Sequence, residues 1–262
     1  MKKIILFIIA IFMCLSLIGC KSTNDKTYIG IISAMDNEIS LLLEKATIEE
    51  EKTIGGVTFY ICKINDKSVV ISRSGIGKIN ASSGVTLLLN NFNISKVIFT
   101  GIAGGTRNEE SVLDEVIGTS VVEHDYGFIT DEGLVWGGGD PGKKEPGEYY
   151  YCDSDLVNLA YEAALSTITN HKVFKGLIAT GDQFIASSEY VQTLVNNFDA
   201  YACEMEGAAI AKVCKTYGKP FVIIRTLSDK ADGEAHDSYE NFGDESANQS
   251  CNIVLKMLEL MK

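Results

Sequence analysis

The chain contains 262 residues, of which 46% are hydrophobic and 22% charged, and its formal net charge is −12. This composition is typical of a globular protein, and it excludes collagenous, low-complexity and disordered chains. Because so acidic a chain has no general attraction to phosphate backbones, we expect no nucleic-acid partner.

Residues 1–19 are predicted to be a signal peptide. Met1-Lys2-Lys3 precedes an apolar run from Ile4 to Ile18, which is too short to favour a membrane-spanning helix. Leu17-Ile18-Gly19-Cys20 resembles the lipobox of bacterial lipoproteins, which implies cleavage before Cys20 and lipidation of its sulfur. The alternative is an uncleaved N-terminal anchor. Both interpretations predict a short linker over residues 20–27 and a domain over residues 28–262, tethered to a membrane outside the cytoplasm.

Patterns typical of strands and helices alternate along the rest of the chain. The predicted strands are Tyr28–Ala34, Val57–Ile64, Ser68–Ser72, Lys96–Thr100, Glu115–Val122, Val173–Thr180, Ala200–Cys203 and Phe221–Thr226. The predicted helices are one that contains Ile39, Leu42 and Leu43, followed by Asn80–Phe92, Ser154–Ile168, Met205–Tyr217 and one from about Glu245 to the C-terminus. Several strands are almost continuously apolar. We therefore predict a single α/β domain whose central, mixed, mostly buried β-sheet is flanked by helices on both faces.

Two glycine-rich segments interrupt this alternation. Gly101–Gly105 is predicted to be a tight turn after the strand at Lys96–Thr100. Residues 127–147 contain seven glycines and two of the three prolines, so we predict a long surface loop there.

The cysteines do not indicate a disulfide framework or a metal site. After the predicted cleavage and apart from Cys20, five cysteines remain, at positions 62, 152, 203, 214 and 251. Their number is odd, their spacing is wide, and no Cys or His pair has the spacing typical of zinc ligands. We therefore predict that most are small buried apolar side chains, and we expect no metal or cofactor.

Acidic residues follow several predicted strands, where open α/β sheets bind their ligands. Glu38 follows the first strand, Glu204 and Glu206 follow a later one, and Asp229 follows the last. Glu38 could simply offset a helix dipole, and Asp229 could end a turn. Glu206 is different because small and apolar residues surround it, so we predict that it is buried and has a partner or a function.

Six segments, in this order, resemble the 5′-methylthioadenosine/S-adenosylhomocysteine nucleosidases of the purine nucleoside phosphorylase superfamily. They are IGIISAMDNE (29–38), SGIGK (74–78), TGIAGG (100–105), TGDQFI (180–185), EMEGAA (204–209) and RTLSD (225–229). The resemblance covers about residues 28–260. It implies a homodimeric enzyme, without a cofactor, that hydrolyses the N-glycosidic bond of 5′-methylthioadenosine, S-adenosylhomocysteine or a related 5′-substituted adenosine and releases adenine.

The chemistry of this reaction explains the three acids that the family uses. Adenine is a poor leaving group as an anion, so an acid must protonate its N7, and the resemblance assigns this role to Asp229. It assigns the activation of the attacking water to Glu38 and the binding of the ribose hydroxyls to Glu206. An anion near the ribose also favours an oxocarbenium-like transition state.

The resemblance implies further contacts with the substrate. Phe184 is expected to stack on adenine, and the backbone of Ile185 to hydrogen-bond its edge. The residues expected around the base, the sugar and the 5′-alkylthio group are Ile76, Ile102, Ala103, Gly104, Met35, Met205, Ser228 and Tyr239. Glu204 and Arg225 are expected to support these groups, and Phe128, after His124-Asp125, to contact the site of the partner subunit.

Two departures from the family pattern leave the preferred 5′ group open. Ile102 stands where the family often has a small hydroxyl residue, and Gly127–Gly147 does not look like the family's usual segment. Two other functions also remain open. A phosphorylase on the same fold would need a phosphate site, but arginine occurs only at positions 73, 107 and 225. A nucleoside-binding lipoprotein that is not an enzyme would fit the lipobox but would not need an acid and a base.

Overall fold

The structure, a computed structural model, describes residues 26–137 and 147–261. The predicted signal peptide and Cys20 therefore lie outside the described residues, as does most of the predicted linker. Within the described ranges, no helix is both long and apolar enough to cross a membrane.

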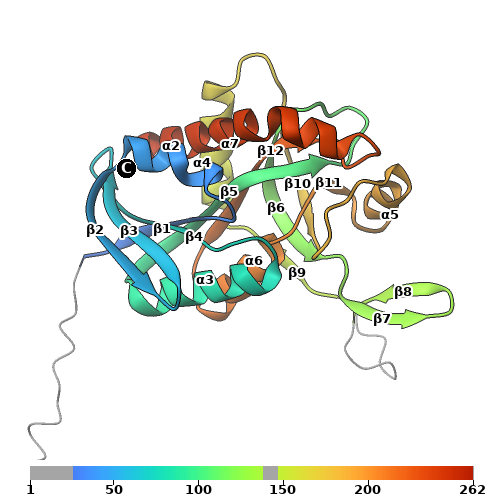
Figure 1. The fold of residues 1–262 in the computed structure, drawn as a ribbon, viewed down its shortest axis with the longest axis horizontal. Helices are drawn as coiled ribbons and strands as arrows, with labels where there is room; N and C mark the ends of the chain where they lie inside the picture. Colours follow the sequence, from blue (N-terminus) through green and yellow to red (C-terminus); the bar gives the residue numbers. More distant parts are fainter. Residues whose placement is uncertain (1–25, 138–146, 262) are drawn as a thin grey trace, which may run out of the picture.

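A ten-stranded sheet forms the centre of the molecule (Figure 1). Its strands are β1 (Tyr28–Ser33), β2 (Thr47–Ile54), β3 (Val57–Ile64), β4 (Lys67–Arg73), β5 (Ile94–Gly105), β6 (Glu115–Glu123), β9 (Tyr149–Tyr151), β10 (Val173–Thr180), β11 (Ala200–Glu204) and β12 (Phe221–Asp229). Their order is β11-β10-β6-β12-β5-β1-β4-β3-β2, with β9 beside β6. The sheet is mixed, because β12 is parallel to β5 but antiparallel to β6.

The last residues of β5 also pair with β11, where Gly104 lies opposite Cys203 and Gly105 opposite Ala202. This extra antiparallel pairing brings the carboxyl ends of β5, β11 and β12 together. A ligand site that uses residues from all three strands can form at this point.

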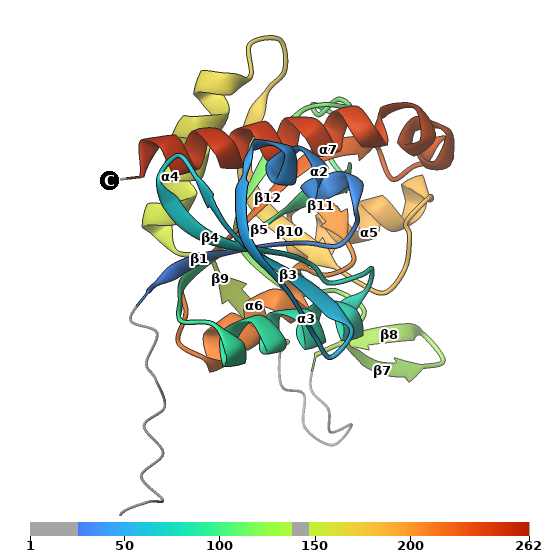
Figure 2. The same ribbon diagram turned by 60° about the vertical axis from the view of Figure 1, so that its left-hand side comes forward.

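Helices cover both faces of the sheet (Figures 1 and 2). They are α2 (Asn37–Lys45), α3 (Lys78–Asn91), α4 (Ser154–Thr167), α5 (Ser188–Phe198), α6 (Gly207–Thr216) and α7 (Ala235–Leu260). In both views α2, α4 and α7 lie on one face, and α3 and α6 lie on the other. The predicted α/β fold with helices on both faces is therefore confirmed.

Two hydrophobic cores lie on the two faces of the sheet, and β1 contributes to both. Ile32 belongs to the core that includes Leu88 of α3, whereas Ile29 and Ile31 belong to the core that includes Leu42 of α2. Side chains alternate between the faces of a strand, so a strand buried on both sides must be apolar throughout. This explains the continuous apolar run that predicted β1.

The structure corrects several predicted boundaries. Gly101–Gly105 is not a turn, because β5 continues to Gly105. The last helix, α7, begins at Ala235 rather than near Glu245, and α6 begins at Gly207 rather than at Met205. The sequence did not predict β2, β9 or α5.

The segment predicted as a long surface loop contains a small hairpin. Its strands, β7 (Gly127–Thr130) and β8 (Gly133–Trp136), form a separate antiparallel sheet that projects from the main body (Figure 1). The prediction of a loop is therefore wrong for these residues. Residues 138–146 of the same segment lie outside the described part.

Candidate active site

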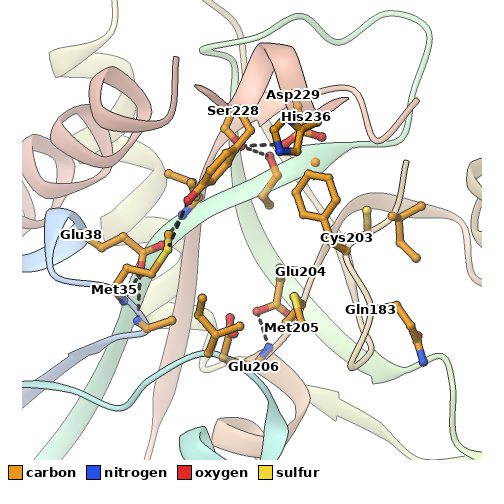
Figure 3. A pocket seen from close by; sticks show the side chains of 18 residues that line it. Met35, Glu38, Gln183, Cys203, Glu204, Met205, Glu206, Ser228, Asp229 and His236 are labelled. Carbon is orange, nitrogen blue, oxygen red and sulfur yellow. Dashed lines mark hydrogen bonds between the residues drawn. The ribbon is translucent and has the colours of Figure 1, made fainter. Parts of the chain in front are cut away.

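A cavity of about 390 Å³ lies at the carboxyl ends of β1, β5, β11 and β12 (Figure 3). Every residue that the sequence assigned to catalysis or substrate binding lines it: Met35, Glu38, Ile76, Ile102, Ala103, Gly104, Phe184, Ile185, Met205, Glu206, Ser228, Asp229 and Tyr239. Glu204 also lines it. The six sequence segments therefore meet at one place in the fold.

Glu38 enters the cavity from the first turn of α2. Its Oε2 accepts hydrogen bonds from the backbone N–H groups of Ala34 at 2.9 Å and Met35 at 2.8 Å, and its Oε1 accepts one from Ile102 at 2.9 Å. Burial raises the pKa of Glu38, although the Arg225 guanidinium and these N–H groups favour the ionised form. The backbone thus fixes the orientation of a carboxylate that is almost fully removed from solvent.

Within the described ranges, Arg225 is the arginine that contacts the cavity's acids, and it lies behind Glu204 and Glu206. Its Nη2 donates to Oε2 of Glu204 at 2.6 Å and lies 3.5 Å from Oε2 of Glu206, while its guanidinium stacks 4.0 Å from the centre of the Phe99 ring. The side chain is completely buried. A buried cation of this kind needs paired acids, because desolvation of an isolated charge is costly.

Glu204 and Glu206 have different partners, although only one residue separates them. Glu204 is saturated, because it accepts hydrogen bonds from Arg225, the Thr180 hydroxyl and the backbone N–H groups of Glu206 and Gly207. Glu206 accepts one strong hydrogen bond, from the Gly77 N–H at 2.8 Å, so part of its carboxylate remains available in the cavity. Burial and the Glu204 carboxylate raise the pKa of Glu206, against the opposing effect of Arg225.

Gly101 lies between Glu38 and Arg225. A Cβ at this position would overlap both Nη1 of Arg225 and Oε1 of Glu38, so the two side-chain atoms face the same space. Nη1 has no hydrogen-bond partner among the described residues. The absence of a side chain at Gly101 lets an acid and a guanidinium N–H approach one point beside the cavity.

Asp229 lies at the end of β12, on the side of the cavity away from Glu206 in Figure 3. Its Oδ2 accepts a hydrogen bond from the Ser228 hydroxyl at 2.8 Å, and its Oδ1 accepts one from the Ala231 N–H at 2.8 Å. Burial raises the pKa of Asp229, although both donors favour the ionised form. The carboxyl group therefore holds a proton at a higher pH than an exposed aspartate does.

Met35, Tyr239 and Phe184 form an apolar part of the cavity wall. The Tyr239 hydroxyl donates to Sδ of Met35 at 3.6 Å, and the Tyr239 and Phe184 rings meet edge to face with centroids 6.1 Å apart. Half of the Phe184 surface is exposed. An exposed aromatic face beside a cavity is suited to stacking on a planar base.

Sequence reasoning missed four lining residues, Ala34, Gln183, Cys203 and His236, of which Ala34 directly precedes Met35. Gln183 and Cys203 lie next to Phe184 and Glu204 in the chain, and His236 lies one helical turn before Tyr239 on α7. This nearness to predicted residues was the signal that could have found them.

The cysteines agree with the prediction that most of them are buried, since Cys62, Cys203, Cys214 and Cys251 are buried and free. In the described part of the chain, no group of three or more His, Cys, Asp or Glu side chains is arranged to bind a metal ion.

Among the predicted site residues that the structure describes, Arg225 and Phe128 do not line the cavity. Arg225 lies behind Glu204 and Glu206 and pairs with both. Phe128 lies on β7 of the projecting hairpin, so its predicted contact with a partner subunit stays a prediction.

Comparison with known proteins places the chain in a family. The family model described as the Phosphorylase superfamily matches residues 28–259, so the chain is a member of that superfamily. A 5′-methylthioadenosine/S-adenosylhomocysteine nucleosidase of Bacillus cereus (strain G9842) is 40% identical over 238 residues, which cover 89% of this chain and 99% of that protein. The chain belongs to this nucleosidase family.

Solved structures of similar proteins agree with this placement. The nucleosidase of the same name from Neisseria meningitidis, in complex with methylthio-immucillin-A, has a TM-score of 0.80 and 36% identity, and the match covers 90% of this chain and 100% of that one. A futalosine hydrolase of Helicobacter pylori strain 26695 has a TM-score of 0.78 and 31% identity, with 90% and 98% of the chains covered. Relatives with almost the same fold thus carry different enzyme names.

Proposed function

We propose that the chain hydrolyses the N-glycosidic bond of 5′-methylthioadenosine, S-adenosylhomocysteine or a related 5′-substituted adenosine and releases adenine. The observation that carries this proposal is the convergence of Glu38, Glu206 and Asp229 on one cavity with an aromatic wall. An acid and a base on two sides of a sugar are what hydrolysis of this bond requires.

Asp229 protonates N7 of adenine as the bond to the sugar breaks. Burial raises the pKa of Asp229, which favours the protonated form that this role requires, and its two hydrogen bonds, with Ser228 and Ala231, hold the carboxyl group in one orientation. Phe184 stacks on the base, and the backbone of Ile185 binds its edge. Adenine then leaves as a neutral molecule.

Glu38 activates the water that attacks C1′ of the ribose. The Glu38 carboxylate lines the cavity, so it can accept a hydrogen bond from a water bound there. Glu38 takes up the proton that the water loses, and its raised pKa makes it a stronger base than an exposed glutamate.

Glu206 binds the ribose hydroxyls and stabilises the positive charge that develops on the sugar. Its carboxylate faces the cavity, and its partners in the described part of the chain are the Gly77 N–H and the more distant Arg225. The backbone around Ala103 and Gly104 and the side chains of Ile76, Ile102 and Met205 enclose the sugar, and Met35 and Tyr239 enclose the 5′ group.

The charges at the site favour hydrolysis over phosphorolysis. Among the described residues, no lysine or arginine lines the cavity. Arg73 pairs with Asp36, Arg107 pairs with Asp199, and Arg225 lies outside the cavity lining and pairs with Glu204. A phosphate group would therefore meet carboxylates rather than the arginines that usually bind it.

The test is adenine release from a panel of 5′-substituted adenosines, with and without inorganic phosphate. We expect free adenine and a free 5′-substituted ribose, at a rate that does not depend on phosphate. Formation of a ribose 1-phosphate only when phosphate is present would identify a phosphorylase. Binding of the nucleosides without release of adenine would identify a binding protein.

We also propose that the mature chain is a lipoprotein anchored outside the cytoplasm through Cys20. The support is the lipobox after a signal-like segment. Cys20→Ala should leave an uncleaved precursor or release the domain from the membrane fraction. Wild-type protein found in the cytoplasm with Met1 intact would contradict this proposal.

The chain is further proposed to be a homodimer in which Phe128 contacts the site of the partner subunit. The support is the projecting hairpin, on which Ile129 and Leu134 are exposed. Phe128→Ala should raise KM for substrates with long 5′ groups more than for 5′-methylthioadenosine. A monomer in analytical ultracentrifugation at the concentration used for the assay would contradict it.

A further inference from the structure

A cluster of one lysine and three carboxylates lies beside the candidate active site, and none of its members lines the cavity. Nζ of Lys78 donates to Oε1 of Glu123 at 2.6 Å and to Oδ1 of Asp125 at 2.7 Å, and it lies 3.8 Å from Oδ2 of Asp182. We call these four residues the Lys78 cluster. Its four members come from the start of α3, the end of β6, the segment after β6 and the segment after β10.

Backbone hydrogen bonds close the cluster into a ring. The Lys78 N–H donates to Oδ1 of Asp182 at 2.8 Å, and the Asp182 N–H donates to Oδ2 of Asp125 at 2.9 Å. Asp125 also accepts a hydrogen bond from Nζ of Lys78. The hydrogen bonds therefore form a closed path from Lys78 to Asp182, from Asp182 to Asp125, and from Asp125 back to Lys78. The Lys78 side chain is 17% exposed and that of Asp125 is 13%, so these charges are better shielded than a surface ion pair.

The ring connects the part of the site that contacts the base of the proposed substrate with the part that contacts its ribose. Gly77, the residue before Lys78, donates its N–H to Glu206. Asp182 directly precedes Gln183, Phe184 and Ile185, which line the cavity. Gly77 itself has φ +91°, and a Cβ on it would lie 3.1 Å from Oδ1 of Asp182, so the two segments are in close contact.

We propose that Lys78 is a positioning residue for the proposed reaction. Its ammonium group and its N–H hold the 182–185 segment against Gly77, which fixes the distance between the aromatic ring that stacks on the base and the carboxylate that binds the ribose. This inference rests on the proposed function. It adds a residue that does not touch the substrate but determines how well the base and the sugar are bound together.

The test compares Lys78→Met with Lys78→Arg in the full chain. Lys256→Met serves as the control, because Lys256 lies on α7 outside the cluster and pairs with Glu259 instead. Displacement of substrate-positioning groups by about 1 Å costs up to about 100-fold in rate, so we expect kcat/KM of Lys78→Met to fall at least about tenfold. We expect most of this change in KM, with a parallel rise in the inhibition constant of adenine. Lys78→Arg should recover part of the loss, and Lys256→Met should match the wild type.

A purely structural salt bridge predicts a different result. Lys78→Met would then lower the melting temperature but keep the KM and the adenine inhibition constant of the wild type, which would overturn the inference. If Lys78→Met does not fold, Asp182→Ala decides by the same two constants, because it removes the acceptor of the Lys78 N–H on a more exposed segment. If the wild type releases no adenine, the proposed function fails. Calorimetric binding of adenine to the wild type and Lys78→Met then tests the cluster alone.

Discussion

Glu206→Gln tests the central assumption about the site, that a buried negative charge beside the sugar drives the reaction. The substitution keeps the size and shape of the side chain and an oxygen that can accept from the Gly77 N–H. It removes the charge that faces the cavity and replaces one acceptor by an NH₂ donor. The fold should therefore be preserved while the interaction with the ribose is lost.

The magnitude follows from the partners of the carboxylate. Of the roughly four acceptor positions on Glu206, Gly77 occupies one and Arg225 faces another, which leaves about two for the ribose hydroxyls. Hydrogen bonds to a charged group contribute about 1.5–3 kcal/mol, against about 1 kcal/mol for neutral ones. A unit charge about 5 Å from the developing cation, at an effective dielectric constant of about 20, adds about 3 kcal/mol. We expect a total loss on the order of 4 kcal/mol, which is about 1,000-fold in kcat.

Stability should move in the opposite direction. Because burial raises the pKa of Glu206 above its ordinary value, the folded protein binds this proton more tightly than the unfolded chain, and stability is lost as the pH rises through the raised pKa. Glutamine resembles the protonated form. The melting temperature of Glu206→Gln should therefore equal or exceed that of the wild type at alkaline pH.

The assay is the steady-state rate of adenine release, with thermal unfolding measured on the same samples. Glu51→Gln is the matched control, because Glu51 is exposed on β2 and far along the sheet from the cavity. Wild-type activity in Glu206→Gln would remove this residue from the site. A loss of activity accompanied by an equally large loss of stability would refute the reasoning about charge.

Four further substitutions separate the other roles. Asp229→Asn should reduce adenine release by about 10²–10⁴-fold while nucleoside binding stays measurable, and a nitrophenyl riboside, whose leaving group needs no proton, should partly restore turnover. Glu38→Gln should be equally impaired with both substrates, and the reverse pattern of rescue would mean that acid and base are exchanged. Gly101→Ala should lose at least about 100-fold in activity, measured as adenine release, because the added methyl group displaces Glu38 and Arg225. Burial raises the pKa of Glu115 to about 8, so the stability of the protein is lost as the pH rises from the ordinary glutamate pKa through this raised pKa. In scanning calorimetry, Glu115→Gln should therefore raise the melting temperature more at pH 9 than at pH 5.

Hydrophobic periodicity predicted the strands that are buried on both faces, but it failed where tertiary contacts override local preference. Gly101–Gly105 has the composition of a turn, yet it is strand because β12 and β11 pair with it. The glycines there make room for Glu38, Arg225 and Asp229. The unpredicted strand β2 has the sequence TIEEEKTI and is exposed along almost its whole length, so it has no apolar alternation to reveal it. Charged residues of this kind are typical of edge strands.

The members of the site could be predicted from sequence because they lie in six recognisable segments, but their connections could not. The role of Arg225 depends on the register of β12 beside β5, which places its guanidinium behind Glu204 and Glu206. The ring through Lys78 depends on three segments that are far apart in the chain. No local pattern encodes such long-range contacts, so these residues appeared in the sequence only as parts of motifs.

The balance of charge around Arg225 accounts for the choice of nucleophile. Glu38, Glu204 and Glu206 surround one arginine, and Glu204 takes its strongest hydrogen bond. If all three acids are ionised, the group as a whole is negative. Such a site stabilises a sugar that becomes positively charged, and it repels an anionic nucleophile. Water is neutral, so a carboxylate such as Glu38 does not repel it. A phosphorylase would need the opposite balance of charge, with cations free to bind phosphate. On the same fold, the number of carboxylates that share the buried arginine can therefore decide between hydrolysis and phosphorolysis.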